Sequence, residues 1–243
     1  MHQLQHNVVS ILYSVKGLIE GHLCRAKEKT FAGEREALAD AHAVIQRVYR
    51  QNDRALSITK RINRILKAKF EEKKSDIPVS VPEVWQEVRR LLRRQAPVAA
   101  LEVLERIPEN FPRLQCKPSD LREILYCLGE NAVQVMGKQG KLIIRAWLGF
   151  SAGEMPLGII TVSDTGPGIA PAKLPCLFDP FFSTKEEGGG SGLGLYLVKA
   201  LVKKNEGSIT VSSFEGCGTT FSLAFPVYSA QASSPTPPQE VFG

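Results

Sequence analysis

The sequence predicts an α+β protein in two parts, a helical hairpin followed by helices layered on a mostly antiparallel sheet. From Leu4 to about Glu72 the chain contains no proline, and its apolar residues repeat at helical spacing. After Pro78 the composition changes to short apolar runs separated by glycine and proline. We therefore expect one domain over residues 1–76 and a second over residues 77–228.

The first domain is predicted to contain two long helices joined by a turn near Gly33. The second helix keeps an apolar alternation of three and four residues from Leu38 to Leu66. The first helix shows the same steps at Leu4, Val8, Ile11, Val15 and Leu18. Two helices alone bury only one face each, so this long regular seam predicts that two chains form a homodimeric four-helix bundle.

The second domain alternates between helical and strand-like segments. Helices are expected over residues 82–94 and 120–136, and from about Leu193 to Lys204. Ser119 or Asp120 is expected to cap the helix that ends at residue 136. Strands are expected where β-branched residues are enriched, over residues 99–106, 142–148, 158–163, 209–213 and 219–225.

Composition limits the compartment and the partners. No apolar run approaches the roughly 20 residues of a membrane-spanning helix, and Met1 is not followed by a signal-peptide pattern. We therefore expect a cytoplasmic segment without direct membrane contact. The net charge of +6 is spread along helices and mixed with acidic residues, which favours solvated helix faces over nucleic-acid binding. Basic clusters such as Arg61 to Lys69 can instead meet an acidic partner protein.

Cysteines and the C-terminus add two smaller expectations. The five cysteines are odd in number, and no two have the spacing of a zinc or redox pair. We expect reduced, structural thiols. Residues 229–243 are polar and rich in proline, and we expect a disordered tail to which no function is assigned.

The first glycine motif is Asp164-Thr-Gly-Pro-Gly168, which directly follows a predicted strand. A carboxylate at a strand end can accept a hydrogen bond from the amino group of adenine. Gly166 and Gly168 would let the backbone approach the ring without a side-chain collision. An ordinary turn is the other interpretation, because Asp and Gly are common in turns.

A denser group of glycines, from Gly188 to Gly194, leads directly into the predicted helix that begins near Leu193. Free backbone amides at a helix start can form a cradle for phosphates. A third group, Gly216-Cys-Gly-Thr-Thr220, supplies another close turn and places Thr219 where it can hydrogen-bond near adenine. A flexible loop is the other interpretation of both groups.

Asn131 lies on the predicted helix over residues 120–136. Its side-chain oxygen can bind an Mg²⁺ ion that bridges the phosphates of a nucleotide. An ordinary polar helix residue is the simpler interpretation when Asn131 is considered alone.

Taken together, the motifs stand in a definite order. The set is Glu130-Asn-Ala132, Asp164-x-Gly-x-Gly168, Phe178-Asp-Pro-Phe-Phe182, Gly190-Ser-Gly-Leu-Gly-Leu195 and Gly216-x-Gly-Thr219. It closely resembles the ATP-binding domain of histidine kinases. The resemblance implies the two-layer α/β sandwich shared with the gyrase and heat-shock chaperone ATPases, with ATP and Mg²⁺ as the bound groups.

The resemblance also implies roles for individual residues. Asn131 would bind Mg²⁺, and Asp164 would bind adenine. Gln134 stands where the family often has a basic residue, so that phosphate contact would pass to Lys138. Further nucleotide contacts would come from Gly166, Gly168, Ile169, Gly190, Gly192, Leu193, Gly194, Leu195 and Thr219. A mobile lid would span about residues 170–190, with Phe178, Phe181 and Phe182 as anchors and Lys185 either near the phosphates or facing solvent.

Of four histidines, His6 begins a run that resembles the phospho-acceptor helix of the same family. It lies two residues, or roughly 200° of helical rotation, from Leu4 and should face solvent. A neutral imidazole nitrogen can attack the γ-phosphorus of ATP in line. A surface histidine without a role is the other interpretation.

Besides Gln134, the chain departs from the family pattern at three residues. Asn7 replaces the usual carboxylate after the histidine, and it can orient an imidazole but cannot take its proton. Ser10 replaces the Thr or Asn that often supports dephosphorylation of the partner. Cys127, one turn before Asn131, replaces the Glu of the ATPase relatives, which disfavours a gyrase-like ATP hydrolase.

The expected function is that of an ATP-dependent protein-histidine autokinase. It would pass the phosphoryl group to an aspartate of a response-regulator receiver domain, as in two-component signal transduction. The alternative is a non-catalytic or weakly catalytic dimeric phosphotransfer or docking scaffold, which Asn7 and Cys127 support.

Overall fold

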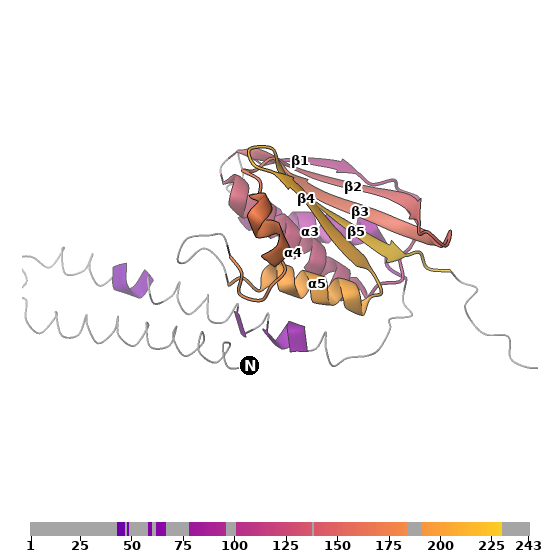
Figure 1. Ribbon diagram of the computed structural model, residues 1–243, viewed down its shortest axis with the longest axis horizontal. Helices are drawn as coiled ribbons and strands as arrows, with labels where there is room; N and C mark the ends of the chain where they lie inside the picture. The colour runs from indigo at the N-terminus through magenta and orange to yellow at the C-terminus, as the bar shows by residue number, and fades with distance from the viewer. Residues whose placement is uncertain are drawn as a thin grey trace, which may run out of the picture.

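The computed structural model describes residues 43–46, 48, 58–59, 62–66, 78–95, 101–137, 139–183 and 191–229. In these ranges the chain forms a sheet with the strand order β1-β2-β3-β5-β4. Helices α3, α4 and α5 lie together on one face of this sheet (Figure 1). The helices are α3 (Val81–Gln95), α4 (Pro118–Met136) and α5 (Gly194–Lys204), with a 3₁₀ helix, η1 (Pro171–Cys176). The strands are β1 (Leu101–Arg106), β2 (Gly140–Phe150), β3 (Pro156–Asp164), β4 (Ser208–Phe214) and β5 (Gly218–Pro226).

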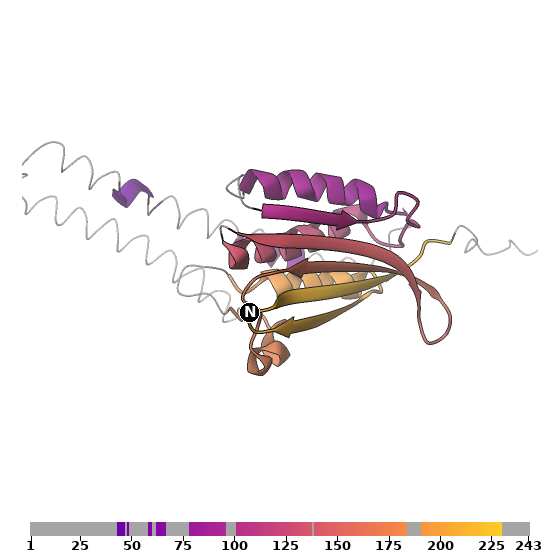
Figure 2. The ribbon, with the colours of Figure 1, turned by 90° about the horizontal axis from the view of Figure 1, so that it is seen from above.

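The predicted mostly antiparallel sheet is confirmed. β1 pairs with β2 in parallel, and the other three pairings are antiparallel. β2 and β3 are longer than the sequence pattern indicated and form a hairpin that projects beyond the neighbouring strands (Figure 2). At its tip the side chains of Phe150 and Met155 are about two thirds exposed, at 67% and 66%. The pattern missed these ends because a solvent-exposed hairpin tip needs no alternation of apolar residues.

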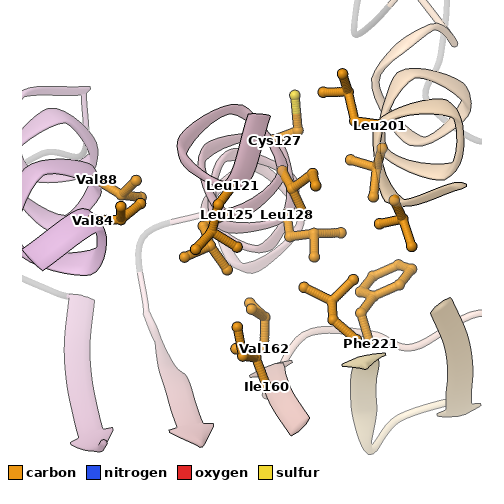
Figure 3. Packing of buried hydrophobic residues seen from close by; sticks show 14 of the residues in the cluster. Val84, Val88, Leu121, Leu125, Cys127, Leu128, Ile160, Val162, Leu201 and Phe221 are labelled. Carbon is orange, nitrogen blue, oxygen red and sulfur yellow. The ribbon is translucent and has the colours of Figure 1, made fainter. Parts of the chain in front are cut away.

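The core lies between the sheet and the helices. α4 sits between α3 and α5, with Leu121 and Leu125 on the side toward α3 and Leu128 above β3 (Figure 3). β3 contributes Ile160 and Val162 to the same layer, and all five side chains are at most 2% exposed. Alternate residues of each strand face this layer because successive side chains of a strand point to opposite sides. The two-layer α/β sandwich expected from the sequence is therefore confirmed.

A polar contact fixes α4 relative to α5. The Asn205 side chain, just after α5, accepts a hydrogen bond from the Lys117 backbone N–H (2.9 Å) and donates one to the Asp120 carboxylate (3.1 Å). The Lys204 ammonium lies 3.4 Å from the same carboxylate. The expectation that Ser119 or Asp120 caps α4 is wrong, because the N-cap residue is Lys117 and its side chain forms no cap hydrogen bond. The helix begins at Pro118, whose missing N–H costs nothing at that position.

Part of the second helix of the predicted hairpin contacts the sandwich. Residues 62–66 are helical, and Ile58 and Ile65 are buried in the same apolar cluster as the core of the sandwich. The Arg64 guanidinium forms an ion pair with Glu123 of α4. The dimeric bundle and the division at residues 76 and 77 stay predictions, since most of residues 1–77 lie outside the described residues, as does the tail beyond Ser229. Among the described helices, none has the length and apolar character needed to cross a membrane.

Leu128 gives a test of the core. Its side chain is 1% exposed, so Leu128→Ala should lower the free energy of unfolding by roughly 2–5 kcal/mol through lost burial and the cavity left behind. Leu148→Ala is the matched control, because Leu148 is 47% exposed and should change stability by no more than about 0.5 kcal/mol. Urea unfolding followed by circular dichroism measures both, and equal effects of the two changes would contradict the assigned core.

Candidate functional site

The candidate site is centred on Asp164, the last residue of β3. Its side chain is 8% exposed. One carboxylate oxygen, Oδ1, accepts a hydrogen bond from the Gly166 backbone N–H at 2.8 Å, and the Thr219 backbone N–H also donates to the carboxyl group. Burial raises the pKa of Asp164 above its ordinary value, and these two backbone donors oppose the rise. A carboxylate held in this way can accept a further hydrogen bond from a ligand.

Glycines bring two backbone turns against Asp164. Gly168 has φ +72°, and a Cβ there would lie 2.0 Å from the Phe214 carbonyl oxygen. Gly218 has φ +94°, and a Cβ there would lie 1.9 Å from the carbonyl oxygen of Asp164. Any other residue at these positions would combine an unfavourable backbone conformation with a clash. The glycines that the sequence singled out therefore serve close packing of the loop and the β4–β5 turn around Asp164.

An apolar wall borders the carboxylate. Val135 of α4 is 40% exposed, and its Cγ2 lies 3.1 Å from where a Gly166 Cβ would be placed. Exposed apolar surface beside a buried carboxylate fits the ring of a purine base, which has both an apolar face and a hydrogen-bonding edge. Asn131 lies one helical turn before Val135, and residues four apart share one face of a helix. Asn131 is half-buried on this face.

The start of α5 has the features expected of a phosphate cradle. Its N-cap residue, Leu193, supplies no side-chain hydrogen bond to the first turn, so the backbone N–H groups at the helix start are not capped by its side chain. The Leu193 side chain is 1% exposed and belongs to the core, and its backbone N–H donates to the Ser191 hydroxyl at 3.4 Å. Gly192 precedes Leu193, and Gly194 and Leu195 follow it as the first residues of α5. The Gly192 carbonyl accepts a hydrogen bond from the Phe181 backbone N–H at 3.0 Å.

The described part of the segment expected to form a lid, residues 170–183, packs on the sandwich. It begins with η1, which the sequence did not predict. The Phe178 ring packs edge-on against Phe221 of β5, with ring centres 6.4 Å apart, and the Lys199 ammonium of α5 lies 5.5 Å from the Phe178 ring centre. Phe181 and Phe182 pack partly buried against the core. These contacts are those expected of the three predicted anchors.

The remaining predicted residues divide into two groups. Gln134 is exposed on α4, and the Ile169 backbone N–H donates to the Ser213 hydroxyl at 2.9 Å. His6, Asn7, Ser10, Lys138, Lys185 and Gly190 lie outside the described residues. Of the described part of the chain, no group of three or more His, Cys, Asp or Glu side chains is arranged to hold a metal.

Cys127 occupies the position one turn before Asn131. It is 2% exposed, and its thiol lies 3.7 Å from Oε1 of Glu123. The Glu130 carboxylate accepts a hydrogen bond from the Tyr126 hydroxyl at 3.4 Å. Burial also raises the pKa of the Cys116 thiol to about 12, which agrees with a structural role for that cysteine.

Ser213 also belongs to the site, although no sequence motif pointed to it. Its side chain is 9% exposed, and its hydroxyl contacts the Gly218 carbonyl and the Thr219 hydroxyl, both at 2.9 Å. The pattern contained a clue, because Ile209, Val211 and Ser213 alternate along one face of β4 that turns toward the helices. A hydroxyl at an inward position of a strand requires hydrogen-bond partners.

Comparison with known sequences identifies similar proteins. Residues 116–229 match the family model described as histidine kinase-, DNA gyrase B-, and HSP90-like ATPase. The chain is 30% identical over 223 residues to the sensor histidine kinase ZraS of Escherichia coli K12, covering 91% of this chain and 44% of that protein. It is 29% identical over 147 residues to sporulation kinase E of Bacillus subtilis 168, covering 60% of this chain and 19% of that protein. The chain thus spans about half the length, or less, of the curated relatives it matches.

Solved structures show the same fold. The Acinetobacter baumannii histidine kinase AdeS aligns with a TM-score of 0.68 at 17% identity, covering 92% of this chain and 98% of that one. Full-length ShkA in complex with AMPPNP aligns with a TM-score of 0.64 at 22% identity, covering 94% of this chain and 46% of that one. At these identities the likeness establishes the architecture alone.

The raised pKa of Asp164 predicts how stability depends on pH. The folded state holds this proton more tightly than the unfolded state, so the contribution of Asp164 to stability falls as pH rises from 3.8 toward the raised value. Asp164→Asn cannot ionise. The free energy of unfolding of Asp164→Asn minus that of the wild type should therefore increase with pH across that window and stay constant above it.

Urea unfolding of both proteins between about pH 4 and pH 8 measures this difference, over a range chosen to bracket the carboxyl titration. Asp179→Asn is the control, since it removes a carboxylate from an exposed position. A difference between Asp164→Asn and wild type that is the same at every pH would show that the buried carboxyl does not titrate as inferred.

Proposed function

Because this chain belongs to the histidine kinase-, DNA gyrase B-, and HSP90-like ATPase family, we propose that it binds ATP and transfers the γ-phosphoryl group to a histidine. Sensor histidine kinases among its relatives favour this activity over ATP hydrolysis. The observation that carries the proposal is the buried Asp164 carboxylate beside the exposed apolar wall at Val135. That pair fits the edge and the face of an adenine base.

The proposed nucleotide lies between β3 and the helices. Asp164 accepts a hydrogen bond from the adenine amino group, and the closely packed turns at Gly166 and Gly218 leave the backbone near the ring. The N–H groups at the start of α5 receive the phosphates, which are anions suited to a helix N-terminus. Full-length ShkA, which has the same architecture, was solved in complex with AMPPNP, an ATP analogue.

Asn131 is the residue proposed to hold Mg²⁺. Its half-buried position one turn from Val135 directs it to the face of α4 that borders the base-binding end. When bound with the nucleotide, the ion supplies neutralisation of phosphate charge. Cys127 offers no carboxylate one turn away, so a general base for activating water is missing from the position where ATP-hydrolysing relatives have one.

His6 is the proposed acceptor. The unprotonated imidazole nitrogen forms a bond to the γ-phosphorus while the bond between that phosphorus and the β–γ bridging oxygen breaks, and ADP leaves. Asn7, the next residue in the sequence, has a side chain that can orient an imidazole but cannot take its proton. We further propose that the phosphoryl group then passes to an aspartate of a response-regulator receiver domain.

The setting of this activity is also proposed. The apolar seam from Leu38 to Leu66 supports a homodimer joined through the helical hairpin. A cytoplasmic location agrees with the need for ATP and for a receiver domain. The charge pattern gives no support for a nucleic-acid partner.

A dimeric phosphotransfer or docking scaffold is the second candidate. It is favoured by Asn7, which cannot take a proton, and by Cys127, which is buried against Glu123 and presents no base. In that case His6 would receive phosphoryl groups only from a phosphorylated partner. The two candidates differ in whether the purified chain labels itself with ATP.

His6→Gln tests the acceptor. Incubation of the purified chain with γ-labelled ATP and Mg²⁺ should give a protein label that is labile in acid and stable in base, as a phosphohistidine is. His6→Gln should abolish the label, because glutamine lacks the nucleophilic ring nitrogen. His2→Gln and His22→Gln are matched controls on the same segment and should keep it. Label that survives in His6→Gln would exclude His6, and absence of label in the wild type would favour the scaffold.

Asn131→Ala tests the metal contact separately from the chemistry. ADP affinity measured by calorimetry in the presence of Mg²⁺ should fall roughly 10- to 100-fold, the loss expected for a contact to a charged group. The affinity measured in EDTA should be unchanged by the substitution. An equal loss in Mg²⁺ and in EDTA would show that Asn131 contacts the nucleotide or supports the fold rather than the ion.

A further inference from the structure

The Ser213 hydroxyl is a buried junction of three hydrogen bonds at the base-binding end of the site. It accepts from the Ile169 backbone N–H, donates to the Gly218 carbonyl and contacts the Thr219 hydroxyl, each at 2.9 Å. Ile169 directly follows the Asp164–Gly168 loop, whereas Gly218 and Thr219 begin β5. One side chain therefore joins the two backbone segments that surround the Asp164 carboxylate.

Counting protons assigns the direction of each bond. A serine hydroxyl has one proton, and the Gly218 carbonyl can only accept, so that proton is committed to Gly218. The Ile169 N–H can only donate to the Ser213 oxygen. The remaining contact must then be donated by the Thr219 hydroxyl, whose single proton points at Ser213. The remaining lone pairs of the Thr219 oxygen are left to act as acceptors only.

Thr219 lies beside Asp164 on the helix-covered face of the sheet. The two residues are directly paired in the antiparallel register of β3 and β5, and such pairs place their Cβ atoms about 5 Å apart. Both side chains are buried, at 6% and 8% exposure. The ionised carboxylate accepts hydrogen bonds, and so does Thr219 once its proton is committed. This end of the site thus presents acceptors to a ligand from both side chains.

We propose that Ser213 is a positioning residue that fixes the Thr219 hydroxyl as an acceptor, so that the site prefers a purine bearing an amino group over one bearing a keto group. The inference rests on the proposed nucleotide site and names how its base is selected. Adenine presents N–H donors at its 6-position, whereas hypoxanthine presents a carbonyl oxygen there. A carbonyl facing fixed acceptors is left unpaired, which costs binding free energy.

Without Ser213 the Thr219 hydroxyl becomes free to rotate and to donate. A keto base then finds a donor where the wild type has none, so discrimination should fall. Loss of the Ser213 hydroxyl also removes the acceptor for the Ile169 N–H and loosens the loop, which lowers affinity for every nucleotide. The ratio of two affinities separates these effects, because loosening alone acts on both bases equally.

The test measures ADP and IDP binding by calorimetry in Mg²⁺ for the intact chain. Ser213→Ala should reduce the preference for ADP over IDP by about 3- to 10-fold, the range of one hydrogen bond. Ser213→Thr keeps a hydroxyl and should retain the wild-type preference. Thr219→Val removes the acceptor itself and should lower the preference to a similar extent, which keeps the inference testable should Ser213→Ala fail to fold.

Thr220→Val is the matched control. Its hydroxyl donates to Ser163 at 2.9 Å across the same two strands but on the opposite face of the sheet. This change should leave the ADP preference intact. An unchanged ratio in Ser213→Ala and in Thr219→Val, with or without weaker binding of both nucleotides, would overturn the inference. If the wild type binds neither nucleotide, the proposed function itself fails, which is a distinguishable result.

Discussion

The Asp164 carboxylate needs backbone donors because it is buried at the end of β3, the central strand of the sheet. Its two donors come from different segments, Gly166 in the loop after β3 and Thr219 at the start of β5. Both can reach it only while β3 and β5 keep the register that pairs Asp164 with Thr219. A slip of one residue would turn Thr219 to the outer face of the sheet. The sheet register, the glycine turns and the site are therefore one constraint.

Helices α4 and α5 border the same site and cover the sheet face on which Asp164 lies. α4 and α5 are joined by Asn205 at the end where α4 begins and α5 finishes. Their opposite ends carry Asn131 on α4 and the first turn of α5, which begins at Gly194. Asn205 fixes α4 and α5 at one end only. At the other end, the distance between the two helices is set by their packing on Ile160, Val162 and Phe221 (Figure 3). The core thereby determines the room available for a ligand.

Much of this arrangement could be predicted from residue patterns. Helical spacing located α4, and β-branched runs located β3 and β5, because burial on one face imposes a period on the sequence. The glycines at 168 and 218 were recognisable since no other residue tolerates their backbone conformation. The start of α4 was misplaced because Pro118 supplies a start without a side-chain cap. Ser213 was missed because its partners are 44 residues away at Ile169 and across the β4–β5 turn.

The long-range contacts that escaped prediction share a physical origin. Sequence patterns report local periodicity, whereas a buried hydroxyl reports the three-dimensional position of its partners. A serine at an inward strand position requires hydrogen-bond donors or acceptors near its hydroxyl. Such a residue marks a polar junction within an apolar layer, but it does not say which segments meet there.

The ion pair between Arg64 and Glu123 has a mechanical consequence. Glu123, Cys127 and Asn131 recur at four-residue intervals and so line one side of α4, and about 12 Å of rigid helix separates the first from the last. The helical residues 62–66, which include Arg64, are thus linked through α4 to Asn131, the proposed metal ligand. A shift of residues 62–66 against α4 would therefore act on the helix face that also carries Asn131.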